Sequence, residues 1–401
     1  MFNRSPGQIT ILTSFDRISL FHTLKPVLFH QPFRRGAFRF KLLDSVEKCL
    51  GRDYNRSLLV MRLPKVPDVR SIEIMRALRA KYRRLVFFND GAAAGTNNFE
   101  FLPFVDRFIV KSMFRDRSQY LLPLYRRRLF TDYYHRKLGV TDPDIENHGM
   151  EKQRDPAASG GGTGATDLLT DWAEVPAAVP LVDPEDLDKL RLGWNIGVGD
   201  FPREDLRQRA GVFTARAFHP KISRLFFRPG MPEFIEPGAA GEGDAVVMRD
   251  IPVHARLGKL PAPSVNRQRE IFLEIADGDP RFVTGRAPKR QYDEEMRRSM
   301  MTLSPFGWGE VCFRDFEAVF AGTLILKPDM GHIDTWPDIY RPGETYVPLS
   351  WDGEDLFEKV EYYLSHPRER AEITRNAQRV YREAIEELPA RFISIMEEAF
   401  G

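Results

Sequence analysis

The 401-residue chain has little of what several protein classes require. It contains only two cysteines, Cys49 and Cys312, which excludes a disulfide framework and a cysteine-based metal cluster. Its eight histidines are scattered without metal-ligand spacing. No apolar run reaches the ~18–20 residues of a membrane-spanning helix, and the first residues lack the features of a secretory signal. We therefore expect a cytoplasmic protein without a bound metal.

Common nucleotide and hydrolase signatures are also missing. The sequence has no Gly-x-Gly-x-x-Gly fingerprint, Walker loop or nucleophile elbow. The run Asp142-Pro143-Asp144 mimics a metal-binding Asp-x-Asp, but it lies beside a proline in a predicted loop. A glycine-rich stretch within 151–167 has almost no large apolar residues, which predicts a flexible insert.

What is present indicates a globular chain of two domains. Hydrophobic residues make up 42% of the sequence, enough for sizeable cores, and the length fits two domains. Charge is unevenly distributed: residues 1–137 hold 27 Lys/Arg and 11 Asp/Glu, and the rest holds 32 and 46. A basic half suits an anionic partner such as a phospholipid surface, a lipid-diphosphate acceptor or nucleic acid. The alternatives are attraction between the two halves and simple solvation of the charges.

The pattern of apolar residues predicts α/β architecture with a parallel sheet in each half. In the first half we expect strands at 9–13, 57–63, 85–88 and 108–110, and helices at 68–82 and 183–190. In the second half we expect strands at 245–248, 281–284, 301–304, 323–326 and 345–348, and helices at 266–275, 292–300, 311–320, 355–364, 369–384 and 388–399. Proline and glycine cluster within 229–243, which we interpret as the domain junction. The predicted domains are therefore 1–237 and 238–385, with a terminal helix at 386–401 that packs back on the first domain.

The most informative segment is 304–323, predicted as a strand end, a glycine turn at Gly307 and Gly309, a helix and a glycine stop at Gly322. Glycines at a strand-to-helix turn let a ligand approach the backbone, and a helix start with unpaired N–H groups suits a diphosphate. Glu317 lies inside the helix, where its carboxylate can accept hydrogen bonds from ribose hydroxyls. Arg314 lies three residues earlier on the same face.

This segment resembles the nucleotide-sugar glycosyltransferases of the GT-B fold, in the branch that includes CgeB-like and exostosin-like proteins. Their Arg-x-x-Glu-Ala-x-x-x-Gly signature is matched by Arg314, Glu317, Ala318 and Gly322. The resemblance implies two Rossmann-like domains facing a cleft, and it gives Glu317 the role of holding the donor ribose. The sequence departs from the family at the first acid, because Gly309 stands there and Glu310 is one position away. A helix-dipole role is the alternative for Glu310.

Further donor contacts are expected where strands of the second half end. Gly285 and Arg286 follow one predicted strand, in the loop that lies against the nucleotide in this fold. Two cations that follow the first strand, Arg256 and Lys259, are candidates for a phosphate clamp, and His332 follows a buried strand. Each of these side chains has the alternative of being solvated.

The first half is expected to bind the acceptor and to supply a catalytic base. Asp90 follows a predicted strand within an Asn-Asp-Gly sequence, which is also a strong turn signal. Asp16 and His22 follow the first strand and are rival candidates, as is His219.

Basic and aromatic residues are mixed in 20–40 and beside the arginines of 126–128. The mixture is compatible with peripheral contact to an anionic membrane, or with a core lined by arginines.

The sequence thus predicts transfer of a sugar from a nucleotide-diphosphate sugar to a hydroxyl of a glycan or lipid-linked acceptor, without a cofactor. The alternatives are a non-catalytic binder of nucleic acid or an anionic surface, and a sugar-nucleotide epimerase of the same fold. No nucleic-acid recognition module accompanies the basic half, so we expect no nucleic-acid partner.

Overall fold

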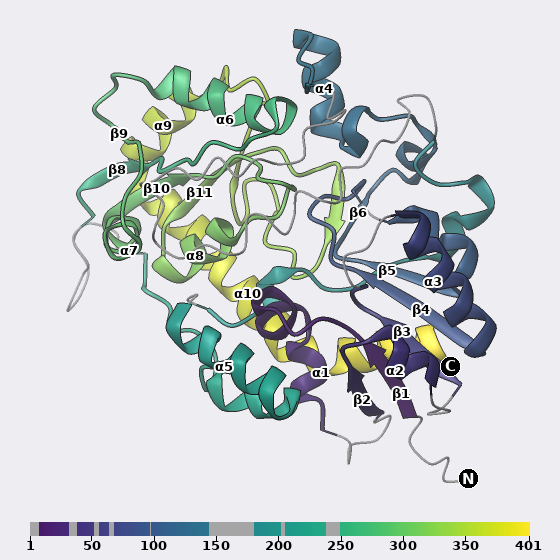
Figure 1. Ribbon diagram of the computed structural model, residues 1–401. Helices are drawn as coiled ribbons and strands as arrows, with labels where there is room; N and C mark the ends of the chain where they lie inside the picture. Colours follow the sequence, from purple (N-terminus) through teal and green to yellow (C-terminus); the bar gives the residue numbers. More distant parts are fainter. Residues whose placement is uncertain are drawn as a thin grey trace.

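The computed structural model describes residues 8–31, 38–51, 56–63, 68–96, 98–143, 180–201, 205–237 and 249–401. Over these residues the chain forms two parallel sheets with helices packed around them (Figure 1). This arrangement confirms the predicted α/β class and the GT-B architecture of two Rossmann-like halves. The glycine-rich insert and the strand expected at 245–248 lie outside the described residues.

The first half is built on a six-stranded sheet in the order β2-β1-β3-β4-β5-β7, with every neighbouring pair parallel. Its strands are β1 (Gln8–Leu12), β2 (Arg39–Leu43), β3 (Ser57–Val60), β4 (Arg84–Asn89), β5 (Arg107–Val110) and β7 (Leu190–Leu192). Its α-helices are α1 (Lys25–Phe29), α2 (Val46–Gly51), α3 (Asp68–Lys81), α4 (Leu129–Leu138) and α5 (Asp205–Ala217). The central strands are apolar along almost their whole length because helices cover both faces of the sheet.

The second half is built on a five-stranded parallel sheet in the order β13-β11-β10-β8-β9. Its strands are β8 (Ile251–His254), β9 (Phe282–Val283), β10 (Ser299–Leu303), β11 (Leu324–Pro328) and β13 (Val347–Leu349). Its helices are α6 (Pro263–Ala276), α7 (Lys289–Arg298), α8 (Phe313–Ala321), α9 (Leu356–Ser365) and α10 (Pro367–Phe400). Gly322 ends α8 with a φ of 64°, the left-handed conformation that the sequence predicts at this position.

Two predictions about helices were wrong. The helix expected at 183–190 is a short 3-10 helix, Pro184–Lys189, because the chain extends into β7 immediately afterwards. The helices expected at 369–384 and 388–399 are one helix, α10, which contains Pro389 in its interior. Tertiary packing along both halves outweighs the helix-breaking preference of that proline.

Helix α10 runs from the second half to the first (Figure 1). Its beginning packs against the second sheet, where Ile373 belongs to the core. Its end enters the core beneath the first sheet, where the Phe392 ring lies 5.6 Å from that of Trp194. The Arg84 side chain also donates to the carbonyl of Ala399 at 3.0 Å. One helix therefore ties the two halves together.

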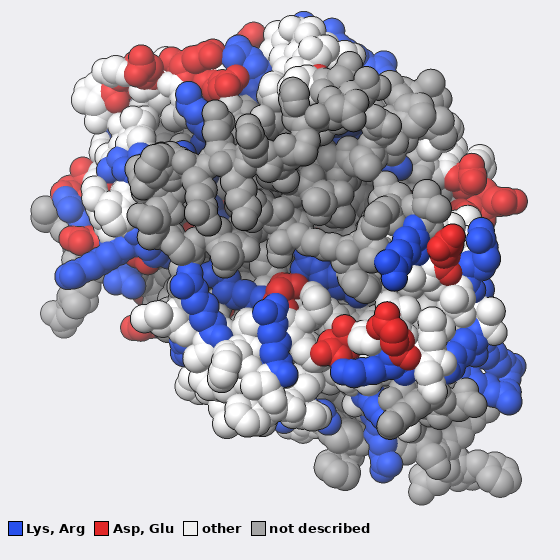
Figure 2. Space-filling model, in the orientation of Figure 1, with Lys and Arg blue, Asp and Glu red and all other residues white. Residues whose placement is uncertain are grey.

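The two halves also meet where their strands end. Strand β6 (Ser112–Phe114), which follows β5, pairs antiparallel with β12 (Ile333–Thr335), which follows β11. Nearby, α4 packs against α6, and the Tyr134 hydroxyl donates to the Trp351 carbonyl at 2.6 Å. On the face shown in Figure 2, Lys and Arg side chains are prominent over the region of the first half.

Candidate functional site

The carboxyl ends of the central strands of both sheets bring their following segments together. The segment after β10, which carries Gly309 and Glu310, contacts the segment after β4, which carries Ala92 and Ala94. The hydroxyl of Thr335, after β11, donates to the carbonyl of Lys111, after β5, at 3.0 Å. Ligands of open α/β sheets bind at such edges, so this junction is the candidate site.

A buried ion pair fixes the start of α8. Asp315 accepts from the Cys312 backbone N–H at 2.9 Å and from the Tyr340 hydroxyl at 2.7 Å. Its carboxylate lies 3.1 Å from the Lys327 ammonium, and both side chains are fully buried. The positive end of α8 is therefore already complemented by an acid of the helix itself. Sequence reasoning missed this pair, although an acid at the third helical position is a recognisable capping signal.

The two glycines of the turn have different surroundings. A Cβ on Gly309 would lie 1.7 Å from the carbonyl oxygen of Ala92, so glycine is needed there for the close approach of the two halves. A Cβ on Gly307 would lie 3.4 Å from the Arg269 guanidinium. The sequence predicted that a diphosphate would approach the backbone at Gly309. Backbone of the first half, at Ala92, occupies that place instead. Gly307 lies beside the Arg269 guanidinium, and contact between Gly307 and the diphosphate stays a prediction.

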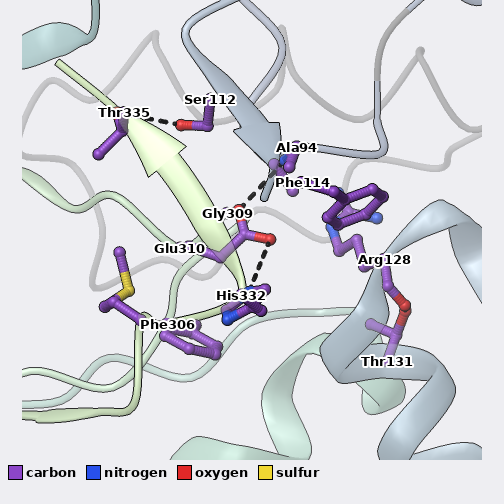
Figure 3. A network of polar contacts seen from close by, with 12 residues as sticks. Ala94, Ser112, Phe114, Arg128, Thr131, Phe306, Gly309, Glu310, His332 and Thr335 are labelled. Carbon is purple, nitrogen blue, oxygen red and sulfur yellow. Dashed lines mark hydrogen bonds and ion pairs between the residues drawn. The ribbon is translucent and has the colours of Figure 1, made fainter. Parts of the chain in front are cut away.

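Glu310 and His332 lie together at the junction of the halves (Figure 3). The buried Glu310 carboxylate accepts from the Ala94 backbone N–H at 3.3 Å and lies 3.7 Å from Nε2 of His332. The His332 ring packs beside that of Trp351, with centroids 5.1 Å apart. Close by, Arg128 donates to the carbonyl of Trp308 at 2.8 Å. Glu310 thus faces the first half, as a contact between domains, and a sugar contact for His332 stays a prediction.

Glu317 and Arg314 project from α8 toward α7. The Glu317 carboxylate, 9% exposed, accepts from the Tyr292 hydroxyl and the Lys289 ammonium, each at 3.2 Å. Burial raises the pKa of the Tyr292 hydroxyl, which keeps it protonated as a donor. Arg314 donates to the same hydroxyl at 3.3 Å and to the Arg256 carbonyl at 2.9 Å. The carboxylate is thereby held by two donors, one of which is itself held by Arg314, a geometry suited to a directed hydrogen-bond acceptor.

A second arginine, Arg269 on α6, lies beside Gly307 and was not predicted. It donates to the carbonyls of Phe306 at 2.9 Å and of Gly258 at 2.7 Å. Burial, together with the nearby charge of Arg314, lowers the pKa of Arg269 to about 10. In the described part of the chain, these two guanidinium groups donate to backbone carbonyls and a tyrosine hydroxyl rather than to carboxylates. Two nearby cations whose hydrogen bonds go to neutral groups, with Glu317 as a nearby acid of Arg314, favour an anionic ligand.

The remaining predicted cations differ in how they are held. Arg256 forms a bidentate ion pair with Glu295, at 2.8 and 2.7 Å, and also donates to the Thr284 carbonyl. Because Glu295 compensates its charge, Arg256 is better suited to hold the loop after β9 in place than to bind phosphate. Gly285 adopts a φ of 82° in that loop, which glycine tolerates without strain. Arg286 and Lys259 are exposed, and contact with phosphate stays a prediction for both.

In the first half, charged residues alternate in sign along the carboxyl edge of the sheet. In sheet order they are Asp16 after β1, Arg62 after β3, Asp90 after β4 and Lys111 after β5. Asp16 forms an ion pair with Arg62 at 2.7 Å. Burial lowers the pKa of Lys111, while the charge of Asp90 opposes that shift.

Of the four predicted bases, Asp16 and His22 are already engaged by the protein, and His219 accepts from the Lys221 backbone N–H at 3.2 Å. Burial alone would raise the pKa of Asp16, but Arg62 and hydrogen bonds from Ser14 and Ser19 lower it, which makes it a weak base. The His22 ring is buried against Phe313, the first residue of α8, with centroids 4.8 Å apart. Asp90 is partly exposed directly after β4, and its role as the base stays a prediction.

Comparison with known proteins finds a family match in the second half. Residues 267–386, which include α7, α8 and most of α6, match the family model described as glycosyl transferase-like. The second half therefore contains a glycosyl transferase-like domain, and the two-sheet architecture of the whole chain is GT-B. No curated protein sequence matches the chain.

Several solved structures are similar over the whole chain at low identity. HepE from Anabaena in complex with UDP is 10% identical, with a TM-score of 0.38 and coverage of 98% of this chain and 100% of that one. T4 phage BGT in complex with UDP and Mn²⁺ is 9% identical, with a TM-score of 0.41 and coverage of 98% and 100%. A glycosyltransferase from Rickettsia africae is 10% identical, with a TM-score of 0.42 and coverage of 99% of both chains.

Proposed function

We propose that the protein is a glycosyltransferase that moves a sugar from a nucleotide-diphosphate sugar to a hydroxyl of a glycan or glycolipid acceptor. The observation that carries the proposal is the arrangement on α8, where Glu317 is oriented by Tyr292 and Lys289 while Arg314 and Arg269 lie close by. A hydrogen-bond acceptor next to two arginines that donate to neutral groups matches a ribose joined to a diphosphate. The match of this segment to the glycosyl transferase-like family supports the same reading.

In this proposal the donor lies along the carboxyl edge of the second sheet. The Glu317 carboxylate accepts hydrogen bonds from the ribose hydroxyls, and Tyr292 holds that carboxylate in place. Arg314 and Arg269 bind the diphosphate beside Gly307. Exposed Lys259 and Arg286 supply further positive charge as the donor enters.

The chemical step breaks the bond between the anomeric carbon and the diphosphate oxygen, and forms a bond from that carbon to the acceptor oxygen. The departing nucleoside diphosphate gains negative charge, which the two arginines stabilise without a metal. Transfer with inversion also needs a base that takes the acceptor proton. Asp90 is the candidate, because it is partly exposed at the edge where the two halves meet.

Calorimetric titration with UDP, GDP, ADP, CDP and TDP, and with the matching nucleotide sugars, tests the proposal. We expect selective micromolar binding of one base, and a loss of about 10-fold or more in Glu317→Ala, since a hydrogen bond to a charged group contributes ~1.5–3 kcal/mol. Glu294→Ala on the exposed face of α7 is the matched control and should bind like the parent.

Two outcomes would contradict the proposal. Absence of binding to any nucleotide, with salt-sensitive binding to RNA or DNA instead, would favour a nucleic-acid binder. Conversion of a nucleotide sugar to its epimer without an acceptor would favour an epimerase.

A further inference from the structure

Helix α5 and the 3-10 helix η8 (Pro220–Phe226) form a hairpin whose outer surface is apolar. The most exposed large apolar side chains of the described residues gather on it or on its connecting turn. They are Leu206 and Leu225, each 83% exposed, Phe218 at 73% and Phe213 at 67%. The other exposed large apolar residues in the described ranges reach at most 47%. We call this surface, from residue 206 to residue 228, the α5–η8 surface.

The exposure is a regular feature of the helix, because α5 has a well-packed inner face. Gln208 and Ala215 are buried, and a Cβ on Gly211 would lie 2.5 Å from the Phe21 ring. The outer face repeats at helical spacing, with Leu206 and Phe213 separated by seven residues. An apolar stripe on the solvent side of an ordered helix indicates a binding surface.

The α5–η8 surface carries charge of one sign. Residues 206–228 contain six Lys/Arg and no Asp/Glu. Five of the six are exposed: Arg209, Arg216, Lys221, Arg224 and Arg228. The sixth, Arg207, is partly buried and forms an ion pair with Asp200 at 2.7 Å. Where Figure 1 places α5, Figure 2 shows mainly blue and white atoms.

We propose that the α5–η8 surface binds the anionic face of a phospholipid membrane. Exposed phenylalanine and leucine side chains enter the boundary between headgroups and acyl chains, and long basic side chains extend to the phosphates around them. A second copy of this chain fits less well, because a symmetric contact would set five exposed basic residues against five more, and residues 206–228 contain no acid. The acceptor half would then lie at the lipid surface, since α5 packs against Phe21 and the segment after β1.

The surface differs from the two segments that the sequence suggested for membrane contact. In 20–40, Phe21 is buried and stacks on Phe227, with ring centroids 4.6 Å apart. In 126–128, Arg128 is only 2% exposed and donates to the Trp308 carbonyl. Part of each segment therefore belongs to the core, although Phe29 is 41% exposed and has the Arg224 guanidinium over its ring. Membrane contact by these two segments stays a prediction.

Co-sedimentation of the full chain with phosphatidylcholine vesicles, with and without phosphatidylglycerol, tests the proposal. We expect binding that requires phosphatidylglycerol and weakens at high salt. Lys221→Gln with Arg224→Gln should weaken it about 25-fold, since each basic residue near an anionic surface contributes roughly five-fold. Phe213→Ser with Phe218→Ser and Leu225→Ser should weaken it by at least ~10-fold, because apolar insertion is lost.

Matched variants remove equivalent groups elsewhere. Arg375→Gln with Arg379→Gln, and Leu122→Ser with Leu138→Ser, change exposed residues outside the surface and should bind vesicles like the parent. Circular dichroism and donor calorimetry show that each variant is folded, and they keep this test separate from that of the transferase activity.

Three results would overturn the proposal. The first is binding that does not depend on phosphatidylglycerol, or no binding to either kind of vesicle. The second is equal loss of binding in the surface variants and in their matched controls. The third is concentration-dependent self-association in ultracentrifugation that the apolar triple variant abolishes while vesicle binding is absent, which would assign the surface to a second copy.

Discussion

The carboxyl edges of the two sheets are built from different charge patterns. At the first sheet, acids and bases alternate from Asp16 to Lys111, and Asp16 is paired with Arg62. At the second sheet, Arg269 and Arg314 donate to neutral groups, and Glu317 is held by Tyr292 and Lys289. An edge whose charges are paired suits a neutral acceptor hydroxyl, and an edge where two arginines donate to neutral groups suits a diphosphate. In the proposed function, this difference assigns the donor to the second half and the acceptor to the first.

The largest effect is expected from substitutions at the carboxyl edge of the first sheet. Asp90→Asn removes the candidate base and should lower kcat by about 10²- to 10⁴-fold, while donor binding stays unchanged. Asp16→Asn should lower kcat far less, because its carboxylate is engaged by Arg62. Sugar-transfer rates with Asp277→Asn as the exposed control measure the difference. A larger loss in Asp16→Asn than in Asp90→Asn would reassign the base.

His254 reports on the positive charge of the second edge. Burial, and then the nearby Arg314, lower the pKa of this fully buried histidine to about 4. The folded state therefore holds it neutral while the unfolded state takes up a proton below about pH 6.5. Its contribution to stability is present above pH 6.5 and is lost as the pH falls toward 4, by up to about 3 kcal/mol.

The measurement is the free energy of unfolding in urea between pH 7 and pH 4. His254→Leu should lose less stability over this range than the parent, whereas His366→Leu on the surface should follow the parent curve. Identical pH dependence in the parent and His254→Leu would show that the edge does not suppress protonation of this residue.

Tyr292→Phe sharpens the comparison with a smaller effect. The change removes the hydroxyl that orients Glu317 and should weaken donor binding about three- to ten-fold, since one hydrogen bond contributes ~0.5–1.5 kcal/mol. Combined with Glu317→Ala it should add little, because both act on the same contact. Calorimetry with Tyr362→Phe as the exposed control checks both statements, and full additivity would separate Tyr292 from the ribose contact.

The sequence predicts the fold well where structure is local. Alternating apolar segments located most strands of both sheets, and the glycine stop of α8 has the conformation expected for Gly322. Arg269, Tyr292 and Lys327 were missed as site residues because their partners are distant in sequence. The order of strands and the tilt of helices bring those partners close, and neither leaves a local pattern. The outward apolar face of α5 was also missed, because the sequence analysis predicted no helix over Asp205–Ala217.

Glu310 shows how a correct segment can hold an unexpected contact. Its position one residue from the family's acid suggested a place near the donor, and its side chain instead accepts from Ala94 across the domain junction. Gly309 also contacts the first half instead of a ligand, since backbone of that half fills the space beside it. Such contacts depend on how two domains meet, which is information that the local sequence of one domain does not carry.

The most direct test of the central claim is the contribution of the second phosphate to binding. Titration of the preferred nucleoside monophosphate and diphosphate should show the diphosphate binding at least ~10-fold tighter, because Arg269 and Arg314 meet the added charge. The gap should shrink at high salt and in Arg269→Gln. Equal affinity for the two nucleotides in the parent protein would contradict a diphosphate site at the edge of the second sheet.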